Sequence, residues 1–210
     1  MGRTDNAAVA VSRDAAIKTA LRLEVATVAW MVVEAALAIG AGVVARSVLL
    51  TAFGIDSVIE LLSGIALYRL LAGAVRTERR TIRVSAVLLV ALCAYVVLSS
   101  AAGLVLRLTP STSIVGIAVT AAAIIAMPLL ARAKGRANLV IQSPSLRADI
   151  AETVSCAYLA AVTLGGLLLS ALVGWWWVQY LAALLLLVWL VPEAREALEA
   201  WTHNGANHRG

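Results

Sequence analysis

Residues 53–70 read FGIDSVIELLSGIALYRL, an apolar stretch with Asp56 and Glu60 in its interior. The stretch lies within an apolar segment of about residues 48–72, long enough to predict a membrane-spanning helix. A charge at the bilayer centre costs at least ~2.5–3.5 kcal/mol, so acids kept there usually face a protein interior and mark an ion pathway. Asp56 and Glu60 are four residues apart and therefore share one helix face.

A second apolar stretch carries chemically similar side chains. Ser143 and Pro144 suit the N-cap and first position of a helix that is predicted over about 145–172. Asp149, Glu152 and Cys156 follow at i, i+3 and i+7, which places them on one stripe of that helix. Two helices with oxygen and sulfur donors could therefore close around a divalent cation.

The composition predicts an integral membrane protein. The chain is 62% hydrophobic and 14% charged, whereas soluble domains are about half apolar and about a quarter charged. With ~20 residues per span, its 210 residues leave room for about six spans and no large extramembrane domain. We therefore expect an all-α polytopic fold of six transmembrane helices. The expected spans are 19–44, 48–72, 84–107, 113–132, 145–172 and 176–192.

The basic residues predict an orientation. On this topology 15 Lys and Arg residues fall on one side and only Arg46 and Arg107 on the other, so both termini should be cytoplasmic. We expect a flexible cytoplasmic tail over 1–17, the six-helix domain over 18–192, and a short helical extension and tail over 193–210. The predicted location is the plasma or inner cell membrane. No basic patch with interleaved aromatic residues supports nucleic-acid binding, despite the net charge of +5.

The two acidic stretches should meet near the membrane midplane. A tetrahedral site of Asp56, Glu60, Glu152 and Cys156 is geometrically reasonable at these depths. Sulfur favours zinc, cadmium or another borderline-soft ion, whereas carboxylates alone suit Mn²⁺ or Mg²⁺. Because the ligands must lose protons to bind metal, metal and protons would exchange. No permanent cofactor is expected. The metal is cargo, with zinc favoured and cadmium, manganese, iron or cobalt as alternatives.

Both stretches resemble the transmembrane part of the cation diffusion facilitator family of metal–proton antiporters. Asp56-Ser57-Val58-Ile59-Glu60 is similar to the family's Asp-Ser-x-x-Asp pattern in its second helix. Leu146-Arg147-Ala148-Asp149, followed by Glu152 and Cys156, resembles its fifth-helix pattern Leu-Arg-Ala-Asp-x-x-His-x-x-x-Asp. The resemblance implies that Asp56, Glu60, Glu152 and Cys156 are metal ligands, and it makes Asp149 a flanking acid on the cytoplasmic approach.

The chain departs from that family pattern in three ways. Glu152 replaces the histidine and Cys156 the second aspartate, which puts the usual preference for zinc in doubt. Val178–Gln179–Tyr180 stands where the family has an acid near the start of helix six. The resemblance is to a short branch without the cytoplasmic C-terminal domain, so a homodimer would have to form through membrane helices.

Simpler roles stay open for the same residues. Asp56, Glu60 and Glu152 could hydrogen-bond to neighbouring helices, and Cys156 could be a small packing residue. Asp149 could pair with Arg147 or Arg22 at the inner interface. Glu34, in the first span, is interpreted either as a proton relay or as a buried hydrogen-bonding group.

The favoured function is export of a divalent transition metal by metal–proton antiport. One alternative is a membrane protein that binds or senses metal without transporting it, and another is a structural membrane protein whose acids only satisfy packing. An enzyme is not expected. The sequence has no nucleophile–base pair, no phosphate-binding glycine motif and no transmembrane histidine.

Overall fold

The chain folds into long helices joined by short connections. The computed structural model describes the backbone of residues 2–73 and 78–206 and the side chains of residues 13–73 and 83–199. Within these ranges there are six helices and no strand. The helices are α1 (Gly2–Ala45), α2 (Val48–Leu71), α3 (Glu78–Val105), α4 (Ile114–Ile141), α5 (Pro144–Val173) and α6 (Val178–Ala206).

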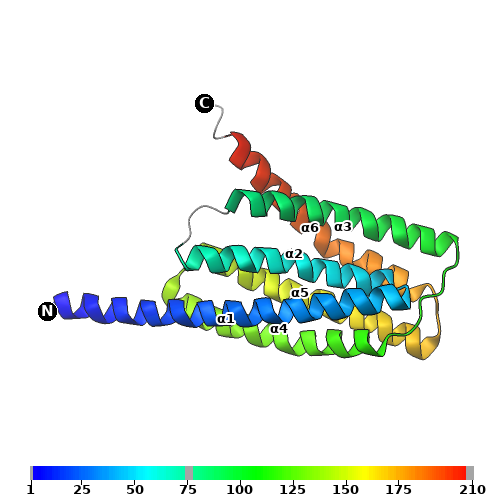
Figure 1. Ribbon diagram of the computed structural model, residues 1–210, viewed down its shortest axis with the longest axis horizontal. Coiled ribbons are helices and arrows are strands. Elements are labelled where there is room, and N and C mark those ends of the chain that lie inside the picture. The colour runs from blue at the N-terminus through cyan, green and yellow to red at the C-terminus, as the bar shows by residue number, and fades with distance from the viewer. Residues whose placement is uncertain (1, 74–77, 207–210) are drawn as a thin grey trace.

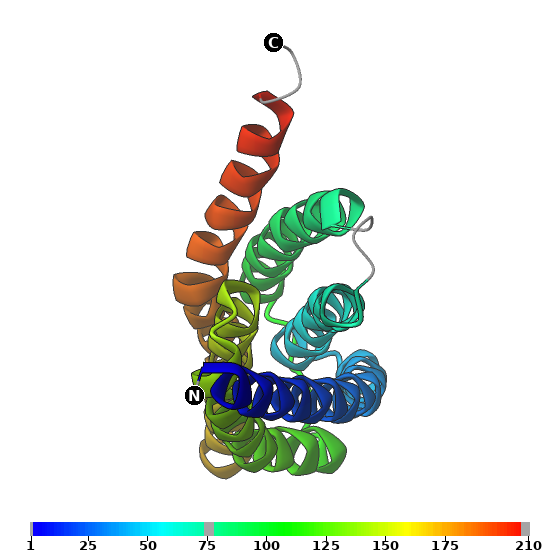
Figure 2. The ribbon, with the colours of Figure 1, turned by 90° about the vertical axis from the view of Figure 1, so that its left-hand side faces the viewer.

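The helices run roughly along one common axis and form two groups (Figure 1). α1, α2, α4 and α5 contact one another as a four-helix unit, while α3 and α6 pair with each other and pack on α2 and α5. Viewed from the end where both termini lie, α3 and the later turns of α6 diverge from the other four helices (Figure 2). The bundle is therefore more open at this end.

Serine side chains begin three of the helices. The hydroxyls of Ser47, Ser113 and Ser143 each accept a hydrogen bond from the backbone N–H three residues later, at the starts of α2, α4 and α5. Such N-caps satisfy donors that the first turn leaves without partners. The predicted helix start at Ser143–Pro144 is confirmed, with Pro144 in the first turn.

Two glycines allow α1 and α2 to approach closely. A Cβ atom on Gly42 would lie 2.5 Å from Thr51 Oγ1, and one on Gly54 would lie 2.8 Å from the backbone nitrogen of Ile39. Small residues at such positions let membrane helices pack by van der Waals contact. The close approach brings Glu34 of α1 next to Ser57 of α2.

The helix boundaries correct several expectations. α1 begins at Gly2, so the backbone of residues 2–17 is helical where a loose tail was expected. α4 does not end near residue 132 but continues to Ile141, because Ala131, Lys134 and Ala137 are buried on one face of the extra turns. α6 continues through Pro192 to Ala206, which confirms the predicted helical extension beyond residue 192. Residues 207–210 of the expected tail lie outside the described residues.

The apolar lengths are those of a multi-pass membrane protein. Among the described residues, five helices are long and apolar enough to cross a membrane: Arg13–Ala45, Val48–Leu71, Arg83–Val105, Ile114–Ile141 and Pro144–Val173. α6, expected to be the sixth span, is not among them. Its apolar run ends at Val191, before Pro192, Glu193 and Arg195.

Candidate functional site: an acidic cavity between four helices

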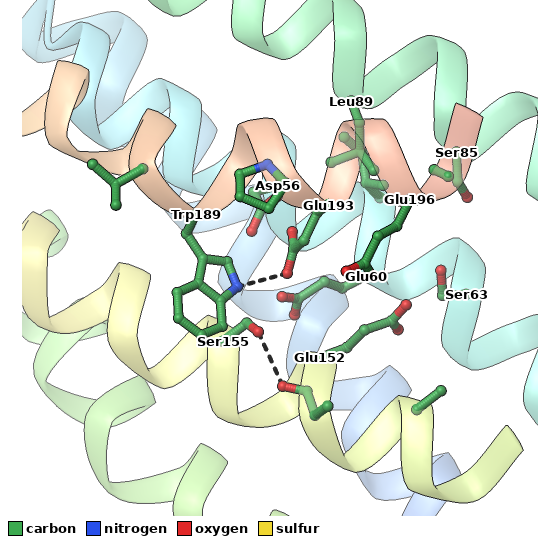
Figure 3. A pocket seen from close by; sticks show the side chains of 16 residues that line it. Asp56, Glu60, Ser63, Ser85, Leu89, Glu152, Ser155, Trp189, Glu193 and Glu196 are labelled. Carbon is green, nitrogen blue, oxygen red and sulfur yellow. Dashed lines mark hydrogen bonds between the residues drawn. The ribbon is translucent and has the colours of Figure 1, made fainter. Parts of the chain in front are cut away.

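A cavity of about 830 Å³ lies between α2, α3, α5 and α6. Its walls are largely apolar, but five carboxylate side chains line it (Figure 3). These are Asp56 and Glu60 of α2, Glu152 of α5, and Glu193 and Glu196 of α6. Three of the four residues that the sequence predicted as metal ligands therefore share one cavity.

The cavity lies in the half of the bundle nearer the termini. Ser85 comes from the first turns of α3, Ala148 from the first turns of α5, and Ala197 from the later turns of α6. Figures 1 and 2 show these parts of the three helices at the end where both termini lie. Toward the other end, buried side chains such as Leu49 and Leu186 fill the space between helices. We therefore expect access to the acids from the end that carries the termini.

Asp56 and Glu60 are the most deeply placed acids of the cavity. Asp56 is 3% exposed and Glu60 is 8% exposed. Asp56 Oδ2 and Glu60 Oε2 are buried and have no hydrogen-bond partner among the described residues. An unpartnered buried carboxylate oxygen costs free energy. These two atoms therefore mark the place where a proton or a cation would be stabilised.

Cys156 lies behind the cavity rather than on its wall. The residue is fully buried and is not among those that line the cavity. Its thiol donates a hydrogen bond to Glu34 Oε1 over 3.6 Å and also interacts with the Glu60 carboxylate. The structure thus places Cys156 between the α1 carboxylate and the cavity acids.

Glu34 is the centre of a hydrogen-bonded cluster that joins α1, α2 and α5. Its carboxylate accepts hydrogen bonds from the Ser57 hydroxyl over 2.7 Å, from the Trp30 indole and from the Cys156 thiol. Glu34 is fully buried. Its role as a buried hydrogen-bonding group is therefore shown, and its role as a proton relay stays a prediction.

Electrostatic interactions connect the cavity acids. Asp56 interacts with Glu60, Glu152 and Glu193, and Glu152 also interacts with Glu193. Clustered carboxylates repel one another, so such a group favours protons or a cation. No three His, Cys, Asp or Glu side chains within residues 13–73 and 83–199 are arranged closely enough to hold a metal ion. Metal binding would require these carboxylates to turn toward one another.

The two α6 acids were not predicted as part of the site. Glu193 and Glu196 were interpreted as part of an extension that leaves the membrane. In the structure both line the cavity with Trp189, whose indole N–H donates to Glu193 Oε1 over 2.8 Å. The spacing of Trp189, Glu193 and Glu196 at i, i+4 and i+7 places them on one helix face. That spacing is the sequence signal from which a shared face of these three side chains could have been predicted.

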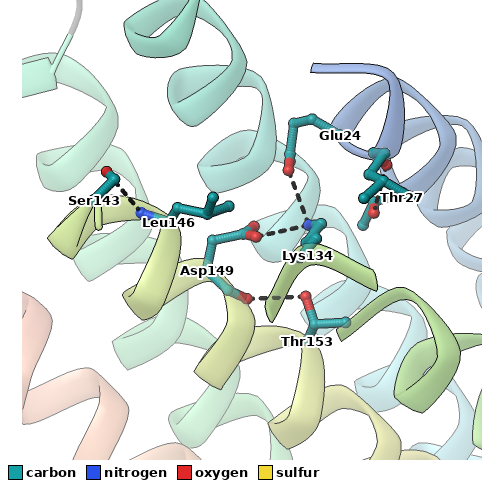
Figure 4. A network of polar contacts seen from close by, with 8 residues as sticks. Glu24, Thr27, Lys134, Ser143, Leu146, Asp149 and Thr153 are labelled. Carbon is teal, nitrogen blue, oxygen red and sulfur yellow. Dashed lines mark hydrogen bonds and ion pairs between the residues drawn. The ribbon is translucent and has the colours of Figure 1, made fainter. Parts of the chain in front are cut away.

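A second buried polar group, which the sequence analysis missed, lies outside the cavity (Figure 4). Lys134 of α4 is fully buried, and its Nζ lies 2.9 Å from Glu24 Oε2 of α1 and 2.7 Å from Asp149 Oδ2 of α5. The three side chains form an ion triad that ties three helices together. The expected end of the fourth span at residue 132 predicts a basic loop around Lys134, whereas α4 continues to Ile141.

The triad corrects the expected environment of Asp149. Neither Arg147 nor Arg22 pairs with Asp149 in an ion pair that the structure describes; Lys134 does. Asp149 is also absent from the residues that line the cavity. Although Asp149 precedes Glu152 by three residues on α5, it faces α4 and α1, so its role on a metal approach stays a prediction.

The chain matches no protein-family model, and no curated protein sequence matches it significantly. The fold and the cavity of the described residues therefore define the protein only as a helical membrane protein with five membrane-length helices in those ranges and a buried acidic site.

Proposed function

We propose that this chain is a multi-pass transporter that moves a divalent transition metal across a cell membrane in exchange for protons. One observation supports this proposal most strongly. Asp56, Glu60 and Glu152, predicted as ligands from two separate apolar stretches, line a single cavity. Acids at this depth are costly, and in membrane proteins they mark ion pathways.

The state of the carboxylates supports exchange between metal and protons. Asp56 Oδ2 and Glu60 Oε2 lack hydrogen-bond partners among the described side chains, so a bound proton or cation would relieve the cost of burying them. Because a metal ligand must be deprotonated, metal entry expels protons and proton entry releases metal. Glu34 contacts Cys156, and Cys156 in turn contacts Glu60. Glu34 is therefore the proton-relay group of this proposal.

The two groups of helices support alternating access. The cavity lies between α2 and α5 of the four-helix unit and α3 and α6 of the pair. A rocking motion of the pair against the unit would close the present entrance and open another, as alternating access requires. With both termini cytoplasmic and α6 as the sixth span, the present entrance faces the cytoplasm, which suits export.

The resemblance of residues 56–60 and 146–156 to the cation diffusion facilitator family supports the same function. It also suggests a homodimer formed through membrane helices and a location in the plasma or inner membrane. On this proposal the metal and protons are substrates, the chain holds no permanent cofactor, and it is not an enzyme.

A flux assay tests the proposal. The purified chain is reconstituted in liposomes, and uptake of Zn²⁺, Cd²⁺, Mn²⁺, Fe²⁺ and Co²⁺ is followed for wild type, Asp56→Asn and Glu60→Gln. Both substitutions keep the shape of the side chain and remove its charge. Saturable uptake of at least one ion, lost in both variants, is expected.

Two other outcomes would replace the proposal. Saturable metal binding without uptake would identify a binding or sensing protein. Metal uptake that is unchanged in both Asp56→Asn and Glu60→Gln would show that these two acids serve packing alone. Glu199→Gln is the matched control, since this exposed α6 acid does not line the cavity.

A further inference from the structure

We infer that the metal is bound by oxygen atoms alone, with Glu193 of α6 as the fourth protein ligand in place of Cys156. This inference rests on the proposed function and specifies its site. The ligand set becomes Asp56, Glu60, Glu152 and Glu193, drawn from α2, α5 and α6.

The positions of the two competing side chains support this set. Glu193 lines the same cavity as Asp56, Glu60 and Glu152, and it interacts electrostatically with Asp56 and Glu152. Cys156 is fully buried and does not line the cavity. A cation that enters the cavity therefore meets the Glu193 carboxylate before it could reach the thiol.

The hydrogen bonds of each side chain agree with these roles. Cys156 donates its S–H hydrogen to Glu34 Oε1, and this bond would be lost if the thiol became the thiolate that metal binding requires. Glu193 Oε1 accepts a hydrogen bond from the Trp189 indole, and the Glu193 carboxylate also interacts with the Ser155 hydroxyl. Neighbouring groups of this kind orient a carboxylate ligand while leaving the deprotonated group acceptor capacity for a metal.

An independent observation indicates that a cation belongs in the cavity. Asp56 and Glu60 are each more than nine-tenths buried, line the cavity, and carry one oxygen without a hydrogen-bond partner among the described residues. Carboxylates in the cavity wall therefore have unused acceptor capacity that a cation would fill.

An all-oxygen site changes the expected cargo. Carboxylate, carbonyl and water ligands suit Mn²⁺ and Mg²⁺, whereas thiolate selects zinc and softer ions. A cavity of about 830 Å³ also leaves space for water molecules that complete an octahedral shell. An all-oxygen site thus lacks the thiolate that selects Zn²⁺ and Cd²⁺, and it makes Mn²⁺ or a similar hard ion a suitable cargo.

Metal binding by the purified full-length chain tests the inference without relying on transport. Mn²⁺ binding is followed by loss of the free-ion electron paramagnetic resonance signal, and Zn²⁺ and Cd²⁺ are tested by competition. Loss of one direct ligand should weaken Mn²⁺ binding on the order of tenfold or more in Glu193→Gln. Cys156→Ala should weaken binding far less than Glu193→Gln, because the thiol contacts Glu60 without itself binding the metal. The control Glu199→Gln should bind as wild type does, and Glu193→Asp should recover part of the affinity.

Each contrary result has a distinct meaning. If Cys156→Ala weakens binding while Glu193→Gln does not, the inference is overturned and the proposed function stands with a thiolate ligand. A Cd²⁺ affinity that falls in Cys156→Ala and not in Glu193→Gln would also overturn it. If folded wild-type protein, verified by its helical circular dichroism, binds no divalent cation, both the inference and the proposed function fail.

Discussion

Lys134 shows how a single buried charge can hold several elements in place. Its ammonium group is fully buried and pairs with carboxylates of Glu24 on α1 and Asp149 on α5. Glu24 Oε1 has no hydrogen-bond partner among the described residues, so one carboxylate oxygen of the triad is unpaired. Two carboxylates around one cation are stable only while the cation is present.

Replacing Lys134 by methionine should therefore destabilise the fold. Removing one partner of a buried ion pair costs about 3–5 kcal/mol, because it leaves an uncompensated charge. Thermal unfolding in detergent should show a clear loss of stability for Lys134→Met, while the exposed Lys18→Met on α1 should unfold as wild type does. Equal stability of the two variants would mean that the triad does not hold α1, α4 and α5 together.

The proposed carboxylate ligands predict a pH dependence with a definite sign. Protons compete with the metal for the same oxygen atoms, so affinity should fall as pH falls. For each proton displaced by the metal, the apparent Kd should rise by about tenfold per pH unit below the pKa of the group concerned. Mn²⁺ titrations of the purified chain at pH 6 and pH 8 measure this, and an affinity independent of pH would argue against carboxylate ligands.

At the scale of the helices, the α1–α2 contact positions the acids of α2. Gly54 lies two residues before Asp56, and a Cβ there would come within 2.8 Å of the Ile39 backbone nitrogen. Gly54→Ala should push the two helices apart at a cost of about 1–3 kcal/mol and shift Asp56 from its position. Weaker metal binding together with a lower melting temperature is expected.

Gly40→Ala is the matched control on α1. A Cβ at Gly40 would meet nothing within 4 Å, so this change should stabilise the helix by up to about 1 kcal/mol. Similar effects of Gly40→Ala and Gly54→Ala on melting temperature would show that close packing at Gly54 is unimportant.

The helices also show what could be predicted from the sequence. The apolar stretches, the Ser143–Pro144 start of α5 and the short gap between the expected spans 19–44 and 48–72 are local signals, and the structure confirms them. The extension of α4 was missed because Lys134 and its neighbours look like a solvated basic loop. Only tertiary contacts from α1 and α5 supply the two carboxylates that make its burial tolerable.

The candidate site was predicted only in part, because tertiary contacts place one of its acids. Asp56, Glu60 and Glu152 are conspicuous because they interrupt apolar stretches, and the structure places all three on one cavity. Glu193 follows Pro192 in a charged segment, where an acid is not unusual. Its place in the cavity depends on the packing of α6 against α5 and α2, which is not encoded in any short motif.

At the scale of the whole molecule, the cavity should be reachable by water from the end that carries the termini. Ser63 lines the cavity, and Ser111 lies in the exposed α3–α4 connection near the other end. In a chain whose native Cys93 and Cys156 are replaced by alanine, Ser63→Cys should react with a membrane-impermeant maleimide from the side of the termini. Ser111→Cys should react from the opposite side.

The same labelling tests the predicted orientation. In inside-out membrane vesicles the Ser63→Cys variant should be modified and the Ser111→Cys variant should not, and right-side-out vesicles should give the reverse. Modification of both variants from one side would contradict the membrane arrangement proposed for the bundle.

The central claim is that metal and protons exchange through the acidic cavity. Its most direct test is the simultaneous recording of metal entry and lumenal pH in liposomes that contain the chain. We predict that protons leave the lumen as Mn²⁺ or another divalent metal enters, and that Asp56→Asn abolishes both movements. Metal entry that is independent of protons, or that continues in Asp56→Asn, would contradict the claim.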